Sequence, residues 1–229
     1  MSNATEKLGT ETPSPPQTLA AISNTISNGT APDAALGTAP DAALDGASAN
    51  HTAVADEECT IRYRTADTPI GTLLLAVSER GVHHIGLRRE DHEHSLELLA
   101  REVSPRLVED QAAAGVVLRQ LDEYFAGART AFDVACDLSL VHGFGRRVVE
   151  ALAHIPYGER WSYGAVAEAV GHPRAARAVG TACGNNPIPL IFPCHRVVRS
   201  DGSIGRYGGG EDVKAALLEL EAKRGLAAR

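Results

Sequence analysis

The stretch NNPIPLIFPCHRVVRSDGSIGRY, residues 185–207, places one cysteine and one histidine at the end of a short apolar run that leads into a glycine-containing loop. Two prolines bracket the apolar run, so we expect a short strand or extended segment that ends at Cys194 and not the interior of a helix. A thiol becomes a strong nucleophile as a thiolate, which requires a base or a positive charge nearby. His195 or Arg196 could supply this, directly or through water. Cys194 is therefore a candidate nucleophile, and a buried structural cysteine is the alternative.

The residues before this stretch predict helices. Helical patterns cover residues 144–155, 162–170 and 173–183, and prolines or glycines mark their ends. Ser162 is expected to cap the second helix, and Pro173 fits the first turn of the third. Because a tight Gly-His-Pro turn joins these last two helices, they are typical of a helix-turn-helix unit. One more helix is expected after the glycine-rich loop, from the segment EDVKAALLELEAKRG.

The residues from 59 to 137 are expected to form a small α/β domain. Apolar and polar side chains alternate over residues 60–88, which predicts antiparallel strands in a hairpin that turns at residues 78–81. Helical periodicity then covers residues 93–103 and 112–125. The second helix is expected to present one apolar face, formed by Leu118, Leu121 and Phe125. The following segment, TAFDVACDLSLVHGF, predicts a further strand that runs into a linker.

This first domain offers no catalytic candidate. His83 and His84 are adjacent, and neighbouring residues of a strand face opposite sides, so we interpret them as ordinary strand histidines and not as metal ligands. The four cysteines of the chain show no CxxC spacing, which indicates neither a disulfide framework nor a local zinc site. Reduced thiols, the lack of a signal-peptide pattern and the lack of a membrane-length apolar run favour a cytoplasmic protein that has no contact with a membrane.

The charge is unevenly distributed along the chain. The formal net charge is -7, but residues 1–58 hold eight acidic residues and one basic residue, whereas residues 143–229 hold twelve basic and eight acidic residues. The segment with the candidate nucleophile is thus the basic one, as contacts with nucleic-acid phosphates require. Residues 1–58 lack aromatic side chains and contain GTAPDAAL twice in tandem, so they predict a disordered acidic tail.

The segment PCHRVV, preceded by GNNPIPLIF and followed by SDGSIGRYGGG, resembles the active-site signature of the O6-alkylguanine-DNA alkyltransferases. The resemblance extends from about Cys59 to Glu221 and is dense from Ile155 onward. It implies an α+β protein, with a ribonuclease H-like α/β domain over residues 59–137 and a winged helix-turn-helix-like domain over residues 138–229. It also implies irreversible transfer of an alkyl group from O6-alkylguanine in DNA to the protein's own cysteine, with O4-alkylthymine as an additional candidate substrate. The resemblance implies no metal and no organic cofactor.

The resemblance also implies roles for the residues around the cysteine. Cys194 corresponds to the nucleophile that keeps the alkyl group. Glu221 corresponds to the glutamate that orients the histidine, which here is His195, so that a relay runs from glutamate through histidine and water to the thiol. Asn186 corresponds to an asparagine that braces the active-site turn.

On the DNA side, the predicted helix over residues 173–183 carries small residues, among them Ala176, and one long cation, Arg177. In the family that it resembles, this helix lies in the minor groove of double-stranded DNA, and the arginine occupies the space of the extruded nucleotide. Tyr163 corresponds to the tyrosine that displaces the target phosphate and later donates a proton to guanine, and Tyr207 could cover the flipped base. A monomeric cytoplasmic protein of bacterial type, associated with the nucleoid when bound to DNA, is implied.

The sequence departs from the family pattern at two places, and two other classes of protein remain as alternative interpretations. The chain has FGRRVV where relatives carry a glutamine-rich segment, and Arg206 stands where relatives usually have a smaller or uncharged residue, which could narrow the pocket. A non-catalytic protein that binds or senses alkylated DNA is one alternative, although Cys194 counts against it. A Cys/His hydrolase is the other, and it would release its product and turn over.

Overall fold

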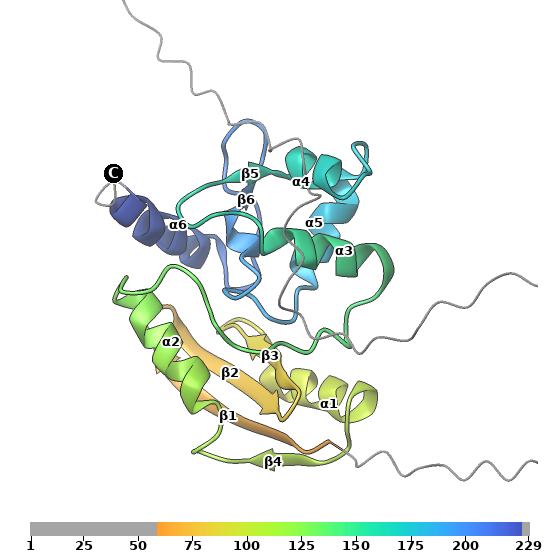
Figure 1. Ribbon diagram of the computed structural model, residues 1–229, viewed down its shortest axis with the longest axis vertical. Helices are drawn as coiled ribbons and strands as arrows, with labels where there is room; N and C mark the ends of the chain where they lie inside the picture. The colour runs from red at the N-terminus through yellow and green to blue at the C-terminus, as the bar shows by residue number, and fades with distance from the viewer. Residues whose placement is uncertain (1–58, 226–229) are drawn as a thin grey trace, which may run out of the picture. The chain divides into compact units, whose positions relative to one another are not determined.

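The computed structural model describes residues 59–225, in which helices lie on both faces of a four-stranded sheet (Figure 1). The predicted tail over residues 1–58 lies outside the described residues. Strands β1 (Ile61–Thr68), β2 (Gly71–Ser78) and β3 (Gly81–Gly86) follow one another in two antiparallel hairpins. The predicted turn at residues 78–81 is therefore confirmed. The glycine at its end has a φ of +116°, a conformation that other residues rarely adopt.

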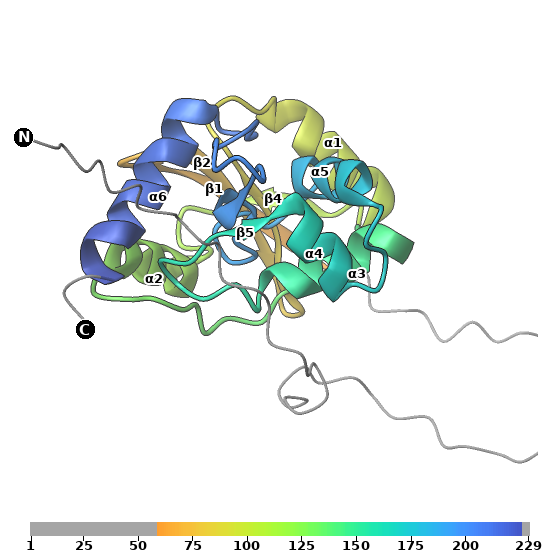
Figure 2. The ribbon, with the colours of Figure 1, turned by 90° about the horizontal axis from the view of Figure 1, so that it is seen from above.

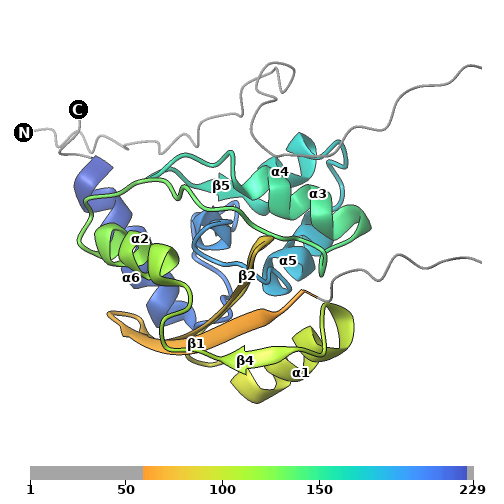
Figure 3. The same ribbon diagram turned by 60° about the horizontal axis from the view of Figure 1, so that its bottom comes forward.

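A short strand that the sequence did not indicate completes the sheet. This strand, β4 (Leu107–Glu109), pairs in parallel with β1, and the order across the sheet is β3-β2-β1-β4. Successive side chains of a strand point to opposite faces, so β2 divides its apolar residues between two cores. Figure 3 shows α1 (His92–Glu102) on one side of the sheet and α2 (Gly115–Phe125) on the other side.

The two faces differ in what covers them. On the α1 side, Leu99 packs with Ile61 and Ala76 in a small cluster. On the α2 side lies a larger core that spans the predicted domain boundary at residues 137 and 138. In this core, side chains of the sheet and α2 pack together with side chains from the second half of the chain. The main contributors to this core are Leu73, Leu75, Ile85, Leu121, Tyr124, Val149, Ile188, Leu190, Val213 and Leu217. The sheet thus supports the second half of the chain directly.

The buried face of α2 differs slightly from the predicted one. Leu121 is fully buried as expected, but Leu118 and Phe125 are only partly buried. Val117 and Tyr124 are buried with Leu121 instead. The helix is therefore turned by about one residue relative to the prediction, and this turn places Tyr124 in the interior.

The strand predicted within the segment 130–144 is wrong. The described backbone from residue 130 to residue 142 is irregular apart from one parallel bridge between Val82 and Cys136. The side chain of Gln120, from α2, explains the irregular backbone. It donates to the Asp133 carbonyl and accepts from the Asp133 amide, each at 2.8 Å. A buried glutamine thus takes the hydrogen bonds that a neighbouring strand would otherwise make.

The second half of the chain is mainly helical, as predicted. Its elements in order are α3 (Gly143–Leu152), β5 (Trp161–Ser162), α4 (Tyr163–Ala169), α5 (Ala176–Gly184), the 3-10 turn η1 (Cys194–Arg196), β6 (Val197–Val198) and α6 (Glu211–Gly225). The two short strands pair in parallel. Figure 2 shows α3, α4 and α5 grouped together, with α6 at the opposite side of the molecule beside α2.

The predicted helix starts are confirmed at α4 and wrong at α5. Ser162 caps α4, because its hydroxyl accepts from the Ala165 amide at 3.0 Å. Pro173 lies before α5 and not in its first turn, since the chain makes a further turn in which the Ala175 amide donates to the His172 carbonyl at 2.8 Å. The helix-turn-helix arrangement of α4 and α5 is otherwise as expected.

Candidate active site

The backbone before Cys194 is a series of turns, so the predicted strand or extended segment is wrong. Asn186 explains the difference, because its amide nitrogen donates to the Phe192 carbonyl at 2.8 Å and its oxygen accepts from the Ile188 amide at 3.1 Å. These two bonds close the chain on itself and hold Leu190 at a φ of +74°, in the left-handed region. The asparagine is thus placed to brace the turn that presents Cys194 at the start of η1.

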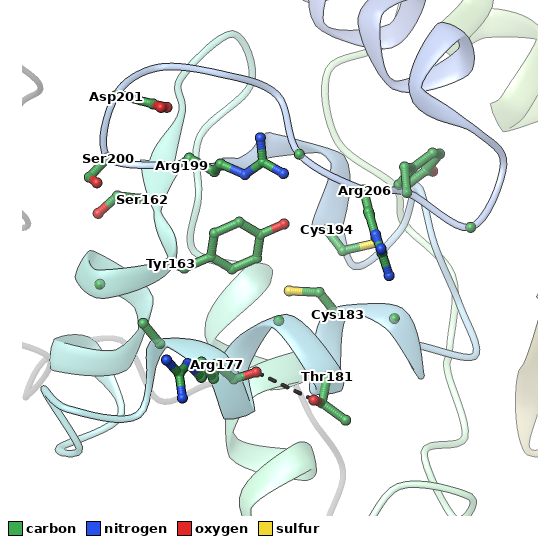
Figure 4. A pocket seen from close by; sticks show the side chains of 17 residues that line it. Ser162, Tyr163, Arg177, Thr181, Cys183, Cys194, Arg199, Ser200, Asp201 and Arg206 are labelled. Atoms are coloured by element: carbon green, nitrogen blue, oxygen red, sulfur yellow. Dashed lines mark hydrogen bonds between the residues drawn. The ribbon is translucent and has the colours of Figure 1, made fainter.

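A pocket of about 880 Å³ opens beside Cys194 (Figure 4). The cysteine is only 5% exposed, and its sulfur faces the pocket. Tyr163 enters from the start of α4, Ala176 and Arg177 line it from α5, and Tyr207 lines it from the glycine-rich loop. All four residues that the sequence assigned to the DNA side therefore meet at one pocket with the candidate nucleophile.

A buried lysine that the sequence analysis missed lies near this thiol. Lys214 is fully buried in α6, and its ammonium donates to the Val197 carbonyl at 2.6 Å. The pKa of the Cys194 thiol is raised overall, because burial outweighs the neighbouring Asn186 amide and the Lys214 charge, which both lower that pKa. The Glu90 carboxylate acts in the raising direction as well. A cation held without access to water is the arrangement that stabilises a thiolate.

His195 lies in a tautomer that leaves one nitrogen available as a base. Both His195 and Glu221 are buried, and 2.9 Å separates Nε2 of the imidazole from Oε1 of the carboxylate. A carboxylate only accepts hydrogen bonds, so Nε2 carries the proton and Nδ1 keeps its lone pair. Within residues 59–225, Nδ1 has no hydrogen-bond partner. Burial lowers the pKa of His195. The Glu221 carboxylate opposes this effect without outweighing it, so the imidazole is neutral.

Arg196 supplies its charge to Glu221 and not to the thiol. Its guanidinium Nε lies 2.9 Å from Oε2 and its Nη2 lies 3.0 Å from Oε1, while Nη1 donates to the Ile155 carbonyl at 2.6 Å. Burial alone would raise the pKa of Glu221, but His195 and Arg196 outweigh it and lower that pKa to about 2. Because Arg196 is engaged by Glu221, His195 and Lys214 are the remaining candidate groups for activating Cys194.

Two more donors surround Glu221. The Gly158 amide donates to Oε2 at 3.0 Å, and the Tyr124 hydroxyl donates to Oε1 at 2.7 Å. Tyr124 belongs to α2, in the part of the chain where no catalytic candidate was expected. The signal available in the sequence was its spacing, because Val117, Leu121 and Tyr124 share one helical face with i, i+4, i+7 periodicity.

The tyrosines of the pocket are tightly enclosed. Gly205 has a φ of +67°, and a Cβ at this position would lie 3.3 Å from the Tyr163 hydroxyl oxygen, so a glycine is required there. Burial raises the pKa of Tyr163, and the nearby thiols of Cys183 and Cys194 act in the same direction. The Tyr207 ring meets the His195 ring edge-on at 6.4 Å. In the described part of the chain, the buried Tyr207 hydroxyl has no hydrogen-bond partner.

Arg177, Arg199 and Arg206 are the exposed cations that line this pocket. Figure 4 shows Arg206 projecting from the glycine-rich loop toward the C-terminal end of α5. Arg206 also lines an adjoining hollow with Arg89 and Asp212. Across residues 59–225, no group of three His, Cys, Asp or Glu side chains is arranged to hold a metal ion. No helix in the same range is long and apolar enough to cross a membrane.

Comparison with family models matches both halves of the chain. Residues 61–138 match the ribonuclease-like domain of 6-O-methylguanine DNA methyltransferase, and residues 143–223 match its DNA-binding domain. The methylated-DNA–protein-cysteine methyltransferase of Mycobacterium tuberculosis is 44% identical over 164 residues, which cover 72% of this chain and 94% of that protein. The protein of the same name from Mycolicibacterium paratuberculosis is 47% identical over 161 residues, which cover 70% of this chain and 92% of that protein.

Solved structures show the same similarity. The crystal structure of Mycobacterium tuberculosis O6-methylguanine methyltransferase matches with a TM-score of 0.63 and 43% identity, over 72% of this chain and 94% of that chain. The structure of Mycobacterium tuberculosis OGT in complex with DNA matches with a TM-score of 0.61 and 43% identity, over 71% of this chain and 94% of that chain.

Proposed function

Since this chain belongs to the family of methylated-DNA–protein-cysteine methyltransferases, we propose that it repairs DNA by moving the alkyl group of O6-alkylguanine onto Cys194. One observation carries the proposal. Of the two thiols that line the pocket, Cys183 and Cys194, it is Cys194 that is followed directly by a histidine bonded to a carboxylate, and a buried ammonium acts on it. This arrangement generates a thiolate without a metal, and a thiolate is the nucleophile that displacement at an alkyl carbon requires.

The chemical step follows from these contacts. The free Nδ1 of His195 takes the thiol proton, directly or through water, and Glu221 stabilises the resulting imidazolium. The sulfur attacks the alkyl carbon, so that an S–C bond forms while the C–O6 bond breaks and its electron pair remains on guanine. Tyr163 gives guanine a proton. The products are guanine and a thioether at Cys194, and because a thioether is not hydrolysed at this site, each molecule acts once.

The DNA side of the proposal rests on the pocket rim. Arg177 is exposed on α5, and Ala176 and Gly180 beside it leave the helix backbone free to approach a groove. We infer that α5 enters the minor groove, that Arg177 takes the space of the extruded O6-alkylguanine nucleotide, and that Tyr207 closes over the flipped base. The unpartnered hydroxyl of Tyr207 then serves as a hydrogen-bonding group for the base.

The remaining assignments concern organisation. We propose that residues 59–137 act as a scaffold and that residues 138–229 carry the chemistry, although one core joins the two. Asn186 fixes the turn that presents Cys194. We also propose that the protein acts on cytoplasmic DNA as a monomer.

The test is incubation with duplex DNA that contains O6-methylguanine, followed by mass spectrometry of the intact protein and of its peptides. We expect one methyl group on the Cys194 peptide and none on the peptides of Cys59, Cys136 or Cys183. Cys194→Ala should accept no methyl group while it still binds DNA. Repeated turnover would indicate the hydrolase alternative, and binding of alkylated DNA without transfer by the wild-type protein would indicate a sensing protein.

A further inference from the structure

Glu221 draws hydrogen-bond donors from both halves of the chain. His195, Arg196 and the Gly158 amide all belong to the residues after 142, and they donate to the carboxylate at 2.9 to 3.0 Å in their shortest contacts. The shortest contact of all, 2.7 Å, comes from the hydroxyl of Tyr124. This residue lies on α2, which sits beside α6 (Figures 2 and 3). The carboxylate that orients the histidine is therefore itself held from the first domain.

The Tyr124 hydroxyl has a fixed position and a fixed role as donor. The side chain is fully buried, and the rings of Phe125, Phe132 and Tyr157 surround it at centroid distances of 5.4 to 6.0 Å. Burial, followed by the charge of Glu221, raises the pKa of the phenol well above its ordinary value, so the hydroxyl stays protonated. Since the partner is an ionised carboxylate, this is a charge-assisted hydrogen bond, which is stronger than a neutral one.

The hydroxyl bonds the same carboxylate oxygen as the histidine does. Oε1 of Glu221 lies 2.7 Å from the Tyr124 oxygen and 2.9 Å from Nε2 of His195, and the hydroxyl is 3.5 Å from that nitrogen. Rotation of the carboxylate would break both bonds together. At metal sites, removing a group that holds a ligating histidine or its carboxylate typically changes metal affinity or activity by about 10- to 100-fold, and Tyr124 holds the carboxylate of His195 in the same way.

We propose that Tyr124 is a positioning residue of the alkyl-transfer site, which fixes Oε1 of Glu221 and thereby the direction of Nδ1 of His195 toward the thiol. This inference rests on the proposed function for its substrate. It gives the first domain a defined part in the reaction besides support, because the hydroxyl reaches the relay from α2. Tyr124 does not touch the substrate, so it acts only through Glu221 and His195.

The experiment is a double-mutant cycle. Tyr124→Phe keeps the ring and removes the hydroxyl, and it should slow single-turnover methyl transfer roughly tenfold with unchanged DNA affinity. In a Glu221→Gln background, Tyr124→Phe should slow methyl transfer by less than about twofold, because the carboxylate that Tyr124 positions is no longer present. If Glu221→Gln does not fold, His195→Ala provides the second background with the same expectation.

A control on the same helix separates positioning from general damage to α2. Gln120 is buried one turn before Tyr124, and its side chain makes two hydrogen bonds to the backbone of Asp133 and not to the relay. Gln120→Ala should leave the transfer rate per folded molecule unchanged. Equal losses for Tyr124→Phe in the wild-type and altered backgrounds, or a wild-type rate for Tyr124→Phe, would overturn the inference.

A second electrophile keeps this test independent of the proposed substrate. Iodoacetamide modifies thiolates in the absence of DNA, and peptide mass spectrometry follows the modification of Cys194 separately from that of the other cysteines. When the double-mutant cycle is measured with iodoacetamide, Tyr124→Phe should reduce the rate of Cys194 modification by the same factor. The effects of Tyr124→Phe and Glu221→Gln on that rate should again be non-additive. If the wild-type protein transferred no methyl group but this pattern held, the proposed function would fail while the role of Tyr124 stood.

Discussion

The buried carboxylate of Glu221 should make the stability of the protein depend on pH in the acid range. Its pKa is lowered from an ordinary value of 4.5 to about 2, because His195 and Arg196 hold the anion in place against the effect of burial. Each tenfold change in proton affinity corresponds to about 1.4 kcal/mol, so this group contributes about 3 kcal/mol to the free energy of unfolding. Since the pKa is depressed in the folded state, the contribution is complete above pH 4.5 and is lost as the pH falls toward 2.

Glu221→Gln isolates this contribution. At neutral pH the variant leaves the buried Arg196 guanidinium without an anionic partner, which typically costs about 3 to 5 kcal/mol. Below the pKa of Glu221 the wild-type carboxyl group is neutral as well, so the two proteins then differ little. The expected result is a difference in unfolding free energy that shrinks by about 3 kcal/mol between pH 5 and pH 2.

Urea unfolding at several pH values, followed by circular dichroism, measures this difference. Other carboxylates with lowered pKa values, such as Asp137 and Asp201, titrate in both proteins and cancel in the comparison. Stability curves that stay parallel from neutral to acid pH would refute the reasoning, because they would show that the ion pair with Arg196 does not hold Glu221 in its charged form.

Three further predictions concern the pocket. Lys214→Met removes the buried cation and should raise the pKa of Cys194, so transfer should slow roughly tenfold at neutral pH and recover as the pH rises, as rate measurements against pH would show. Arg177→Ala should reduce repair in duplex DNA by tenfold or more, since unstacking costs a few kcal/mol, while reaction with free O6-benzylguanine stays nearly unchanged. An equal loss on both substrates would argue against base flipping by this residue. Arg206→Ser should widen the pocket mouth and speed reaction with O6-benzylguanine relative to O6-methylguanine in competition assays.

The sequence was sufficient to locate the site because its signals are local. The Cys-His pair, the cap at Ser162 and the glycine-rich loop depend on neighbours in the chain, and the pocket brings Cys194 together with Tyr163, Arg177 and Tyr207 as expected. Where a distant side chain decides the backbone, the prediction was wrong. Asn186 turns residues 188–192 back on themselves, although their composition suits a strand.

The two residues that were missed, Lys214 and Tyr124, are buried polar groups on apolar helix faces, and Glu221 was assigned through the resemblance alone. Lys214, Leu217, Leu218 and Glu221 share one face of α6 with i, i+3, i+4, i+7 spacing, and all four are buried. Spacing of this kind predicts burial, but it cannot name the partner that makes a buried charge tolerable. That partner is a carbonyl 17 residues away for Lys214 and a histidine and an arginine 25 or 26 residues away for Glu221.

The pairing of these charges determines which group acts on the thiol. With His195 neutral, the buried ions within residues 59–223 are Glu221, Arg196 and Lys214, which together leave one positive charge. Because Arg196 bonds both oxygens of Glu221, the carboxylate is neutralised locally and repels a thiolate less. Lys214 donates to a neutral carbonyl and not to a carboxylate in the described chain, so its charge remains available to Cys194. Transfer of the thiol proton to His195 then leaves this sum of buried charges unchanged, and the new thiolate lies near the Lys214 cation, whereas an unpaired Glu221 would oppose the thiolate.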